Sequence, residues 1–434
     1  MIFIYSEYKT NRLTYALKVV FQQVLHVSFK EVGLEEFRSL GGAPKINYSS
    51  KNIADSLSIS PHPLLFEQDI RMQKLAVEWQ NSIPYFFKTS KNSSFQFDLF
   101  AAVFYMVSRY EEYLPSFLDE HQRYAAESSL AFQNNFLKLP VVHLWAAELK
   151  SKILKTTPNY RFPAQQYQYL NSMDIDSAYA FKGKGFTRFT GGLLKALLQG
   201  NTSDLKKRIH YFLFQKDPYD TYSVIEDIQK KYQTKNAYFF LLGDRAQFDK
   251  NLSYKSKILE GLIRRLQKNN LVGIHPSYAS NSEPNKIDIE KKRLEKITNT
   301  MIAKSRQHFL KLNLPNTYEN LLLNGINNDY SMGFASQVGF RAGICVAFPF
   351  FNLKKNEERP LLIHPFQVMD GTLNHYLQLS PQQAVSEIEK IVAQVKTVHG
   401  TFVSLWHNSS LSEQGEWKGW TTVYKKLVKI AHKH

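Results

Sequence analysis

The chain has 434 residues, of which 43% are hydrophobic and 21% are charged, and it carries a formal net charge of +17. This length exceeds one ordinary domain, and the composition supplies large apolar cores, which excludes an intrinsically disordered protein. A basic excess favours polyanionic partners, but the Lys and Arg residues are scattered and form no recognisable nucleic-acid motif. We therefore interpret the charge as a solvated basic surface, with a functional patch as the alternative, and expect no specific nucleic-acid partner.

The N-terminal stretch Met1–Ser6 is apolar but lacks the basic start, long apolar run and cleavage site of a signal peptide. No run approaches the ~18 apolar residues that a membrane span needs. These features predict a cytoplasmic protein without a transmembrane segment, for which a peripheral contact with an anionic surface stays open. The single cysteine, Cys345, excludes an internal disulfide and lies in an apolar stretch, which is typical of a buried structural thiol.

Residues 1–160 are predicted to form a smaller α/β domain whose role the sequence does not indicate. The polar, proline-containing stretch 156–160 marks its end. In this region Arg109, Glu111 and Glu112 could form a structural ion-pair cluster or contact the following domain, and we favour the structural interpretation. The expected elements are a strand at Met1–Tyr5, helices at Thr10–Leu25 and Phe95–Tyr113, and a helix that begins at Pro140.

In residues 161–434 strand-like segments alternate with helical ones, which predicts βαβ units and a parallel sheet. With Ala237–Leu242 and Gly343–Phe348 the strand candidates number about seven, which favours a closed or nearly closed barrel. In such a barrel the side chains at the C-terminal strand ends converge on one mouth, where the chemistry lies. Five candidates end in polar or ionisable residues: Tyr167–Asp176, Leu271–Tyr278, Ser305–Leu312, Gly325–Met332 and Thr401–Ser410.

Two carboxylates, Asp174 and Asp176, end the first of these segments. Alternation along an extended chain places both on one face, where their charges repel, so that one holds a proton or both bind a cation. One would then act as a general base and the other as a metal ligand. A turn or a helix N-cap is the structural alternative.

Four further side chains at strand ends could complete such a site. His275 ends an apolar strand and could bind a metal as a neutral imidazole, although a lone His is more often hydrogen-bonded structure. Arg306 and His308 are two residues apart, so in an extended strand both point the same way. Arg306 could orient a carboxylate such as Asp174, or form a structural salt bridge. His407 follows apolar residues and suits a general acid.

Other chemistries find little support in the sequence. Gly183, Gly185, Gly191 and Gly192 lack the spacing after a strand that a phosphate-binding loop requires, which argues against a nucleotide site. The serines lack the context of a nucleophile elbow, and without paired cysteines a multi-thiolate zinc site is excluded. Asp370 precedes a glycine and is interpreted as a turn residue.

Taken in order, these segments resemble the motifs of the polysaccharide deacetylase (NodB-homology, carbohydrate esterase) superfamily. With the element Ser108–Tyr113 the chain resembles, more narrowly, a Bacteroidetes-type branch with a distinct N-terminal domain, and the resemblance covers nearly the whole chain. It implies an α/β fold: a distorted (β/α)7 TIM-like barrel preceded by the smaller α/β domain. The matching stretches are Asp174–Asp176, Gly273–Tyr278, Ser305–His308, Asp329–Gly333 and Leu405–Asn408.

The resemblance also implies a hydrolase that uses a divalent metal, usually zinc, to remove acetyl groups from an N- or O-acetylated saccharide. Its substrate would be a cell-envelope or surface glycan. By position, the general base corresponds to Asp174, the first two metal ligands to Asp176 and His275, the arginine that orients the base to Arg306, and the general acid to His407. Further residues expected at the barrel mouth are Asp329, Asn408 and Tyr278.

The chain departs from the family pattern at one metal ligand. The pattern places a second metal-binding His four residues after the first, and this position is Ala279. His308 could supply the third ligand from the next strand, which would keep an Asp/His/His set. The alternative is a barrel that has lost the metal chemistry and serves as a glycan-binding or assembly protein.

Overall fold

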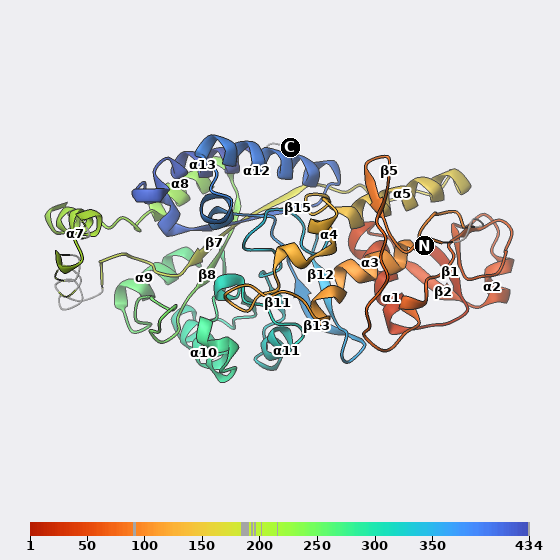
Figure 1. The fold of residues 1–434 in the computed structure, drawn as a ribbon, viewed down its shortest axis with the longest axis horizontal. Coiled ribbons are helices and arrows are strands. Elements are labelled where there is room, and N and C mark those ends of the chain that lie inside the picture. The colour runs from red at the N-terminus through yellow and green to blue at the C-terminus, as the bar shows by residue number, and fades with distance from the viewer. Residues whose placement is uncertain are drawn as a thin grey trace.

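The computed structural model contains two mainly parallel sheets that follow one another along the long axis of the molecule, with helices around them, and a small antiparallel hairpin (Figure 1). The mixed α/β class expected from the sequence is therefore confirmed. The discounted glycines Gly185 and Gly192 lie outside the described residues. The structure describes residues 1–89, 93–183, 191, 194, 197–200, 202–214 and 216–432.

The N-terminal sheet has the order β2-β1-β3-β4, and all of its neighbouring strands are parallel. The helix predicted over 10–25 is present. Its N-terminus is capped by the Thr10 side chain, which accepts from the Leu13 N–H. Elements here are β1 (Ile2–Ser6), α1 (Asn11–Lys18) with a π-helical extension (Val19–Val24), β2 (Phe29–Val32), α2 (Leu34–Ser39), β3 (Lys45–Tyr48), β4 (Leu57–Ser58), the hairpin β5 (Glu78–Gln80) and β6 (Ile83–Tyr85), α3 (Leu99–Val107), α4 (Leu130–Gln133) and α5 (Val141–Thr156).

The larger sheet has the order β12-β13-β11-β10-β9-β8-β7-β15-β14, and only the β12–β13 pair is antiparallel. Its strands are β7 (Gln168–Ile175), β8 (Lys235–Phe240), β9 (Leu271–Ile274), β10 (Lys304–Ser305), β11 (Asn328–Asp329), β12 (Phe348–Asn352), β13 (Glu357–Ile363), β14 (Val368–Met369) and β15 (Thr401–His407). The helices of this part are α7 (Thr202–Phe214), α8 (Tyr222–Tyr232), α9 (Lys257–Leu266), α10 (Asn285–Thr298), α11 (Asn316–Leu323), α12 (Pro381–Thr397) and α13 (Trp420–His432).

The closed (β/α)7 barrel is not confirmed, because the strand ladder of the described residues ends at β12 and β14. However, β13 and β14 belong to one stretch of chain, 357–369, which pairs first with β11 and then with β15. Between these pairings the Phe366 N–H donates to the Met332 carbonyl and the Gln367 N–H donates to the Val403 carbonyl. This stretch therefore bridges the two sides of the parallel array.

Several predicted strands are shorter than expected, and one is wrong. The segments predicted at 305–312 and 325–332 contain only the two-residue strands β10 and β11. After β10 the chain turns, because Phe309 and Leu310 adopt left-handed backbone angles, with φ of 59° and 53°. The segment Gly343–Phe348 is not a strand: Gly343 is also left-handed, with φ of 67°, and β12 begins only at Phe348.

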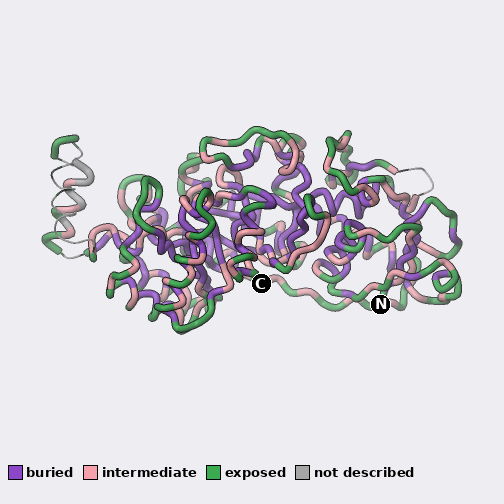
Figure 2. The backbone as a smooth tube through the Cα atoms, turned by 90° about the horizontal axis from the view of Figure 1, so that it is seen from below, coloured by how far each residue is buried: buried purple, intermediate pink, exposed green. Residues whose placement is uncertain are grey.

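Buried residues run through both parts of the molecule (Figure 2). An ion-pair network also joins the parts: Glu112 Oε1 accepts from Arg109 Nε at 2.7 Å, and its Oε2 accepts from Arg341 Nη2 at 2.7 Å. Arg109 also binds Glu111 at 2.7 Å, so the interpretation as a structural ion-pair cluster agrees with the geometry. None of the helices in the described part of the chain is long and apolar enough to span a membrane.

Candidate metal centre

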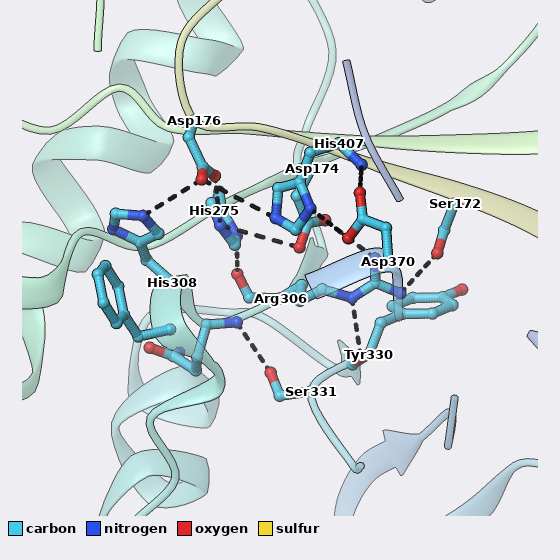
Figure 3. A network of polar contacts seen from close by, with 12 residues as sticks. Ser172, Asp174, Asp176, His275, Arg306, His308, Tyr330, Ser331, Asp370 and His407 are labelled. Carbon is cyan, nitrogen blue, oxygen red and sulfur yellow. Dashed lines mark hydrogen bonds and ion pairs between the residues drawn. The ribbon is translucent and has the colours of Figure 1, made fainter. Parts of the chain in front are cut away.

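The predicted catalytic and metal-binding residues meet at the C-terminal ends of strands β7, β9, β10 and β15, which lie in one run of the sheet with β8 between β9 and β7 (Figure 3). Parallel pairing explains this, because it sets His407 of β15 directly beside Asp174 of β7. On the other side, Gly273 lets β9 approach β10: a Cβ there would lie 2.7 Å from the Lys304 carbonyl oxygen. This close approach brings His275 next to Arg306.

Three of these side chains form a cluster with the composition of a metal site. Asp176, His275 and His308 each offer one ligand atom, and the three atoms lie within 4.8 Å of one another. Nε2 of His275 is 3.2 Å from Asp176 Oδ1, and Nε2 of His308 is 3.7 Å from Asp176 Oδ2. The two His side chains are at most 5% exposed, whereas that of Asp176 is 42% exposed. The cluster is therefore closed behind the imidazoles and accessible at Asp176.

The imidazoles of His275 and His308 are each held at Nδ1 by an acceptor, and Figure 3 shows the acceptor of His275. Nδ1 of His275 lies 2.6 Å from the Arg306 carbonyl oxygen, and Nδ1 of His308 lies 2.9 Å from Asp249 Oδ1. A ring that donates from Nδ1 presents its lone pair on Nε2, the usual arrangement of a metal-binding His. In both rings Nε2 is the atom that faces Asp176.

The charges of the cluster favour a cation. Burial lowers the pKa of His308, but the carboxylates of Asp176 and Asp249 outweigh this effect and raise it to about 9. Burial raises the pKa of Asp176, yet His308, His407 and His275 hold it well below its usual range. Two imidazole nitrogens and a carboxylate are a donor set that suits zinc and related divalent ions. These residues therefore fit a divalent metal.

Asp174 and Arg306 form a buried pair beside this cluster. Arg306 Nη1 donates to Asp174 Oδ1 at 2.9 Å, while its Nη2 donates to Ser172 Oγ at 2.8 Å. Its Nε donates to the Tyr330 carbonyl at 2.9 Å, and the guanidinium lies 4.6 Å from the centroid of the Phe239 ring. All three nitrogens of the guanidinium are thus engaged, which fixes the Asp174 carboxylate.

His407 is held by Asp370, which the sequence analysis took for a turn residue. His407 Nδ1 lies 2.8 Å from Asp370 Oδ1, and the His407 N–H donates to Asp370 Oδ2 at 2.8 Å. Asp370 also accepts from the Ser410 hydroxyl and is fully buried. Its place directly after β14, a strand paired with β15, is the signal that could have identified it. Asp249, which holds His308, was likewise missed.

A cavity of about 330 Å³ opens beside these residues. Asp174, Asp176, His275, His308, Asp370 and His407 line its polar side, and Leu310, Met369, Tyr376 and Trp417 line an apolar and aromatic side. The N-terminal part of the chain supplies Arg123, which the sequence did not single out. Arg123 donates to the Phe309 carbonyl at 2.7 Å and to the Tyr376 hydroxyl at 3.0 Å. Both parts of the chain therefore build this cavity.

The other expected mouth residues do not line this cavity. Asp329 is buried behind it, where it accepts from the hydroxyls of Ser305 and Ser331, each at 2.9 Å. The Asn408 amide donates to the Tyr219 carbonyl at 3.0 Å. Tyr278 lines a separate cavity of about 180 Å³. The polar groups of Asp329 and Asn408 hold neighbouring chain segments, which is why they do not face the cavity.

A family model described as a family of unknown function (DUF7033) matches residues 2–158. No functionally curated protein matches the chain. Among solved structures, the chain is similar to a putative polysaccharide deacetylase from Mycobacterium smegmatis, with 10% identity, a TM-score of 0.40, and coverage of 62% of this chain and 85% of that one.

A polysaccharide deacetylase from Bacillus cereus matches with 11% identity, a TM-score of 0.28, and coverage of 61% and 86%. A 7,8-dihydropteroate synthase from Vibrio fischeri reaches the same TM-score of 0.28, with 10% identity and coverage of 63% and 95%. Scores this low identify no family for the chain.

Proposed function

We propose that the protein is a metal-dependent hydrolase that removes acetyl groups from an N- or O-acetylated saccharide of the cell envelope or a surface glycan. The observation that carries the proposal is the convergence of Asp176, His275 and His308, with both imidazoles held at Nδ1 so that Nε2 faces Asp176. In this proposal residues 161–434 are a (β/α)7 barrel of the polysaccharide deacetylase type and residues 1–160 are a separate N-terminal domain.

Asp176, His275 and His308 would hold the ion, with zinc as the first candidate. When bound, such an ion acts as a Lewis acid on an acyl oxygen and on water. The acetyl group would enter the cavity between this cluster and the side formed by Leu310, Met369, Tyr376 and Trp417. An aromatic surface of this kind suits the faces of sugar rings as well as the acetyl methyl group.

Asp174 would act as the general base. Its carboxylate is 2% exposed and would take a proton from the attacking water. Arg306 orients this carboxylate, because its Nη1 donates to Oδ1 at 2.9 Å. Since Ser172 and the Tyr330 carbonyl hold the rest of the guanidinium, the base has a defined direction before substrate arrives.

His407 would act as the general acid. Asp370 binds its Nδ1, so that Nε2 lies on the side of Asp176, at 3.9 Å from Oδ2. From Nε2 the proton would pass to the leaving nitrogen or oxygen of the sugar as the bond to the acetyl carbon breaks. Base and acid thus lie on neighbouring strands, beside the proposed metal ligands.

Metal content tests the proposal directly. After reconstitution with zinc and removal of excess metal, the wild type is expected to retain about one ion per chain, and His308→Ala is expected to lose most of it because a ligand is removed. His375→Ala is the matched control, because His375 lines the same cavity outside the ligand cluster. Unchanged zinc in His308→Ala, measured by elemental analysis, would exclude His308 as a ligand.

A catalytically diverged glycan-binding protein is the second candidate, and Ala279 is the observation that favours it. Acetate release from acetylated chito-oligosaccharides and peptidoglycan fragments separates the two candidates. The hydrolase releases acetate when zinc is present and loses this activity in Asp174→Asn. A chain that binds these glycans without retaining zinc or releasing acetate is the diverged form.

A further inference from the structure

A second cavity adjoins the candidate metal centre. It has a volume of about 320 Å³ and shares four wall residues with the first cavity: Arg123, Leu310, Ala335 and Tyr376. Because the same side chains line both cavities, the two lie side by side with this wall between them. Each has the size of an ordinary small-ligand site, and such sites are common where two domains meet.

The N-terminal part of the chain supplies one side of the second cavity through a hairpin, residues 117–125. In this 117–125 hairpin Leu118 and Tyr124 form an antiparallel bridge, and the Asp119 N–H donates to the Arg123 carbonyl at 2.9 Å. Asp119 also binds the Arg123 guanidinium at 2.7 Å. The same guanidinium donates to the segments that follow β10 and β14. The hairpin is therefore fixed to the larger sheet beside the first cavity.

The charges in the lining of the second cavity favour a neutral ligand. The guanidinium groups of Arg123 and Arg341 are each bound by a carboxylate at 2.7 Å. Two further carboxylates of the lining belong to the exposed residues Glu120 and Glu127. Carboxylates accept hydrogen bonds from hydroxyl groups but repel anions. The cavity therefore suits a ligand rich in hydroxyl groups better than an acidic one.

Two phenylalanines give the second cavity an apolar surface. Phe334 is buried in its wall, where its ring stacks on that of Tyr124 with the centroids 6.4 Å apart. Phe117, on the 117–125 hairpin, also lines the cavity but is 71% exposed. A single exposed aromatic ring is ordinary on a protein surface, but this one borders a cavity beside the metal centre. A ring in this position suits the apolar face of a sugar.

We propose that the second cavity binds a neighbouring sugar unit of the same glycan chain while the acetylated unit occupies the first cavity. The substrate is then a neutral oligosaccharide or polysaccharide whose chain passes over Tyr376, the ring that lines both cavities. The N-terminal part of the protein selects substrates by their length through the 117–125 hairpin. The place of the acetylated unit rests on the proposed function, whereas glycan binding at the hairpin is measured without catalysis.

The length of the glycan tests this proposal. Fully N-acetylated chito-oligosaccharides, from the monosaccharide to the hexamer, are compared as substrates of the zinc-loaded protein by acetate release. They are also compared as ligands of Asp174→Asn by calorimetry, because this variant prevents turnover in the proposed mechanism. Both kcat/KM and affinity should rise about 10-fold or more once the glycan is long enough to reach Phe117, and should then level off.

Phe117→Ala removes the exposed ring and leaves the core intact. It should lower the affinity and kcat/KM for the hexamer about 10-fold, the latter through KM, and should affect the shortest bound glycan far less. Leu118→Ala is the matched control, because Leu118 is the next residue of the same hairpin, is 42% exposed and lines a different cavity. This control should keep the wild-type dependence on length.

The outcomes separate this proposal from the proposed hydrolase. Equal hexamer affinity in the presence and absence of the Phe117 ring overturns the second binding site, as does a protein that binds none of the glycans. Acetate release without any dependence on length also overturns it but leaves the hydrolase standing. Hexamer binding that Phe117→Ala weakens, with no acetate released from any glycan, supports the second site and overturns the hydrolase.

Discussion

At the scale of single residues, the candidate site depends on the acceptors behind its imidazoles. His275, His308 and His407 are each held at Nδ1, by the Arg306 carbonyl, Asp249 and Asp370 respectively. These acceptors decide which nitrogen is presented to the cavity, so they are as necessary to the chemistry as the rings themselves. The two carboxylates among them also raise the pKa of the ring that each one holds, for His308 together with Asp176.

Substitution of Asp370 tests this at His407. Burial lowers the pKa of His407, but the carboxylates of Asp370 and Asp176 outweigh it and raise it to about 10. An acid acts in its protonated form, so activity is present below this pKa and is lost as the pH rises through it. Asp370→Asn removes the largest raising contribution and should move the alkaline limb of kcat/KM for acetate release down by about one pH unit or more.

The same variant should lower the rate about 10-fold to 100-fold, because His407 loses its orienting partner. Its zinc content, measured by elemental analysis, should stay at the wild-type level, since Asp370 is not among the clustered ligands. An alkaline limb at the same pH in both proteins would exclude Asp370 as the residue that tunes His407.

At the scale of elements, the short strands β9 and β10 position the ligands. They pass so close to one another that a Cβ at Gly273 would meet the Lys304 carbonyl oxygen at 2.7 Å and the Phe239 ring at 2.8 Å. Each strand then ends, and the following residues turn toward the cavity. The brevity of these strands is thus part of how His275 and His308 come together.

Gly273→Ala tests this packing. The added methyl group must push β9 away from β10, which should destabilise the fold by about 1–3 kcal/mol and weaken zinc binding, because His275 follows two residues later. Gly261→Ala is a control of opposite sign: no atom lies within 4 Å of a Cβ there, in the middle of α9. That change should stabilise the protein by about 0.5–1 kcal/mol. Urea unfolding measures the stability of both variants, and a metal titration measures their zinc affinity. Equal changes in stability and zinc affinity in the two variants would contradict the close packing of β9 against β10.

At the scale of the whole molecule, the N-terminal part belongs to the architecture of the site. Arg123 forms part of the cavity wall and holds Phe309 and Tyr376, while Glu112 is bound by Arg109 from its own part and by Arg341 from the other. The side chains of Arg109, Arg341 and Glu112 are at most 3% exposed. Removing one partner of such a buried network leaves uncompensated charges in the interior.

Glu112→Gln should therefore lower the free energy of unfolding by about 3–5 kcal/mol at neutral pH. Burial raises the pKa of Glu112, but Arg341 and Arg109 outweigh it and lower the pKa. The stability from Glu112 is thus present above the usual pKa of a glutamate and is lost as the pH falls through the lower pKa of the folded state.

Glu78→Gln is the control: it breaks an exposed ion pair with Lys88 and should lower the free energy of unfolding by less than about 1 kcal/mol. Denaturant unfolding at neutral and acidic pH compares the two, and equal losses would contradict the role of burial.

Much of the site could be predicted from the order of polar strand ends. The proposed ligands Asp176, His275 and His308 do meet in space, although their roles stay predictions. Asp249 could not be found in this way, because it lies in a loop well after the end of β8. Asp370 directly follows β14, but this two-residue strand was not predicted, so Asp370 resembled a turn residue. Their partners come from other segments, and only the fold brings these together.

The fold was predicted in class but not in detail. Apolar alternation predicted β7, β8 and β15 well, since these strands form long parallel pairings. It overextended β10 because it does not detect the left-handed turn at Phe309 and Leu310. It began β11 too early, at Gly325, which is itself left-handed with φ of 71°. The predicted strand Gly343–Phe348 was wrong for the same reason, since the left-handed Gly343 cannot continue a strand.

The pairing of β15 with β7 determines when the site can exist during synthesis. A growing chain makes the wall residue Arg123 first, then the ligands from Asp176 to His308, and only near its end His407. A chain made as far as His308, three residues beyond β10, already contains every member of the proposed metal cluster. It still lacks the strand that carries the acid, because His407 reaches Asp174 only through β15. In the proposed function, the metal ligands are thus all present in the growing chain before the acid is.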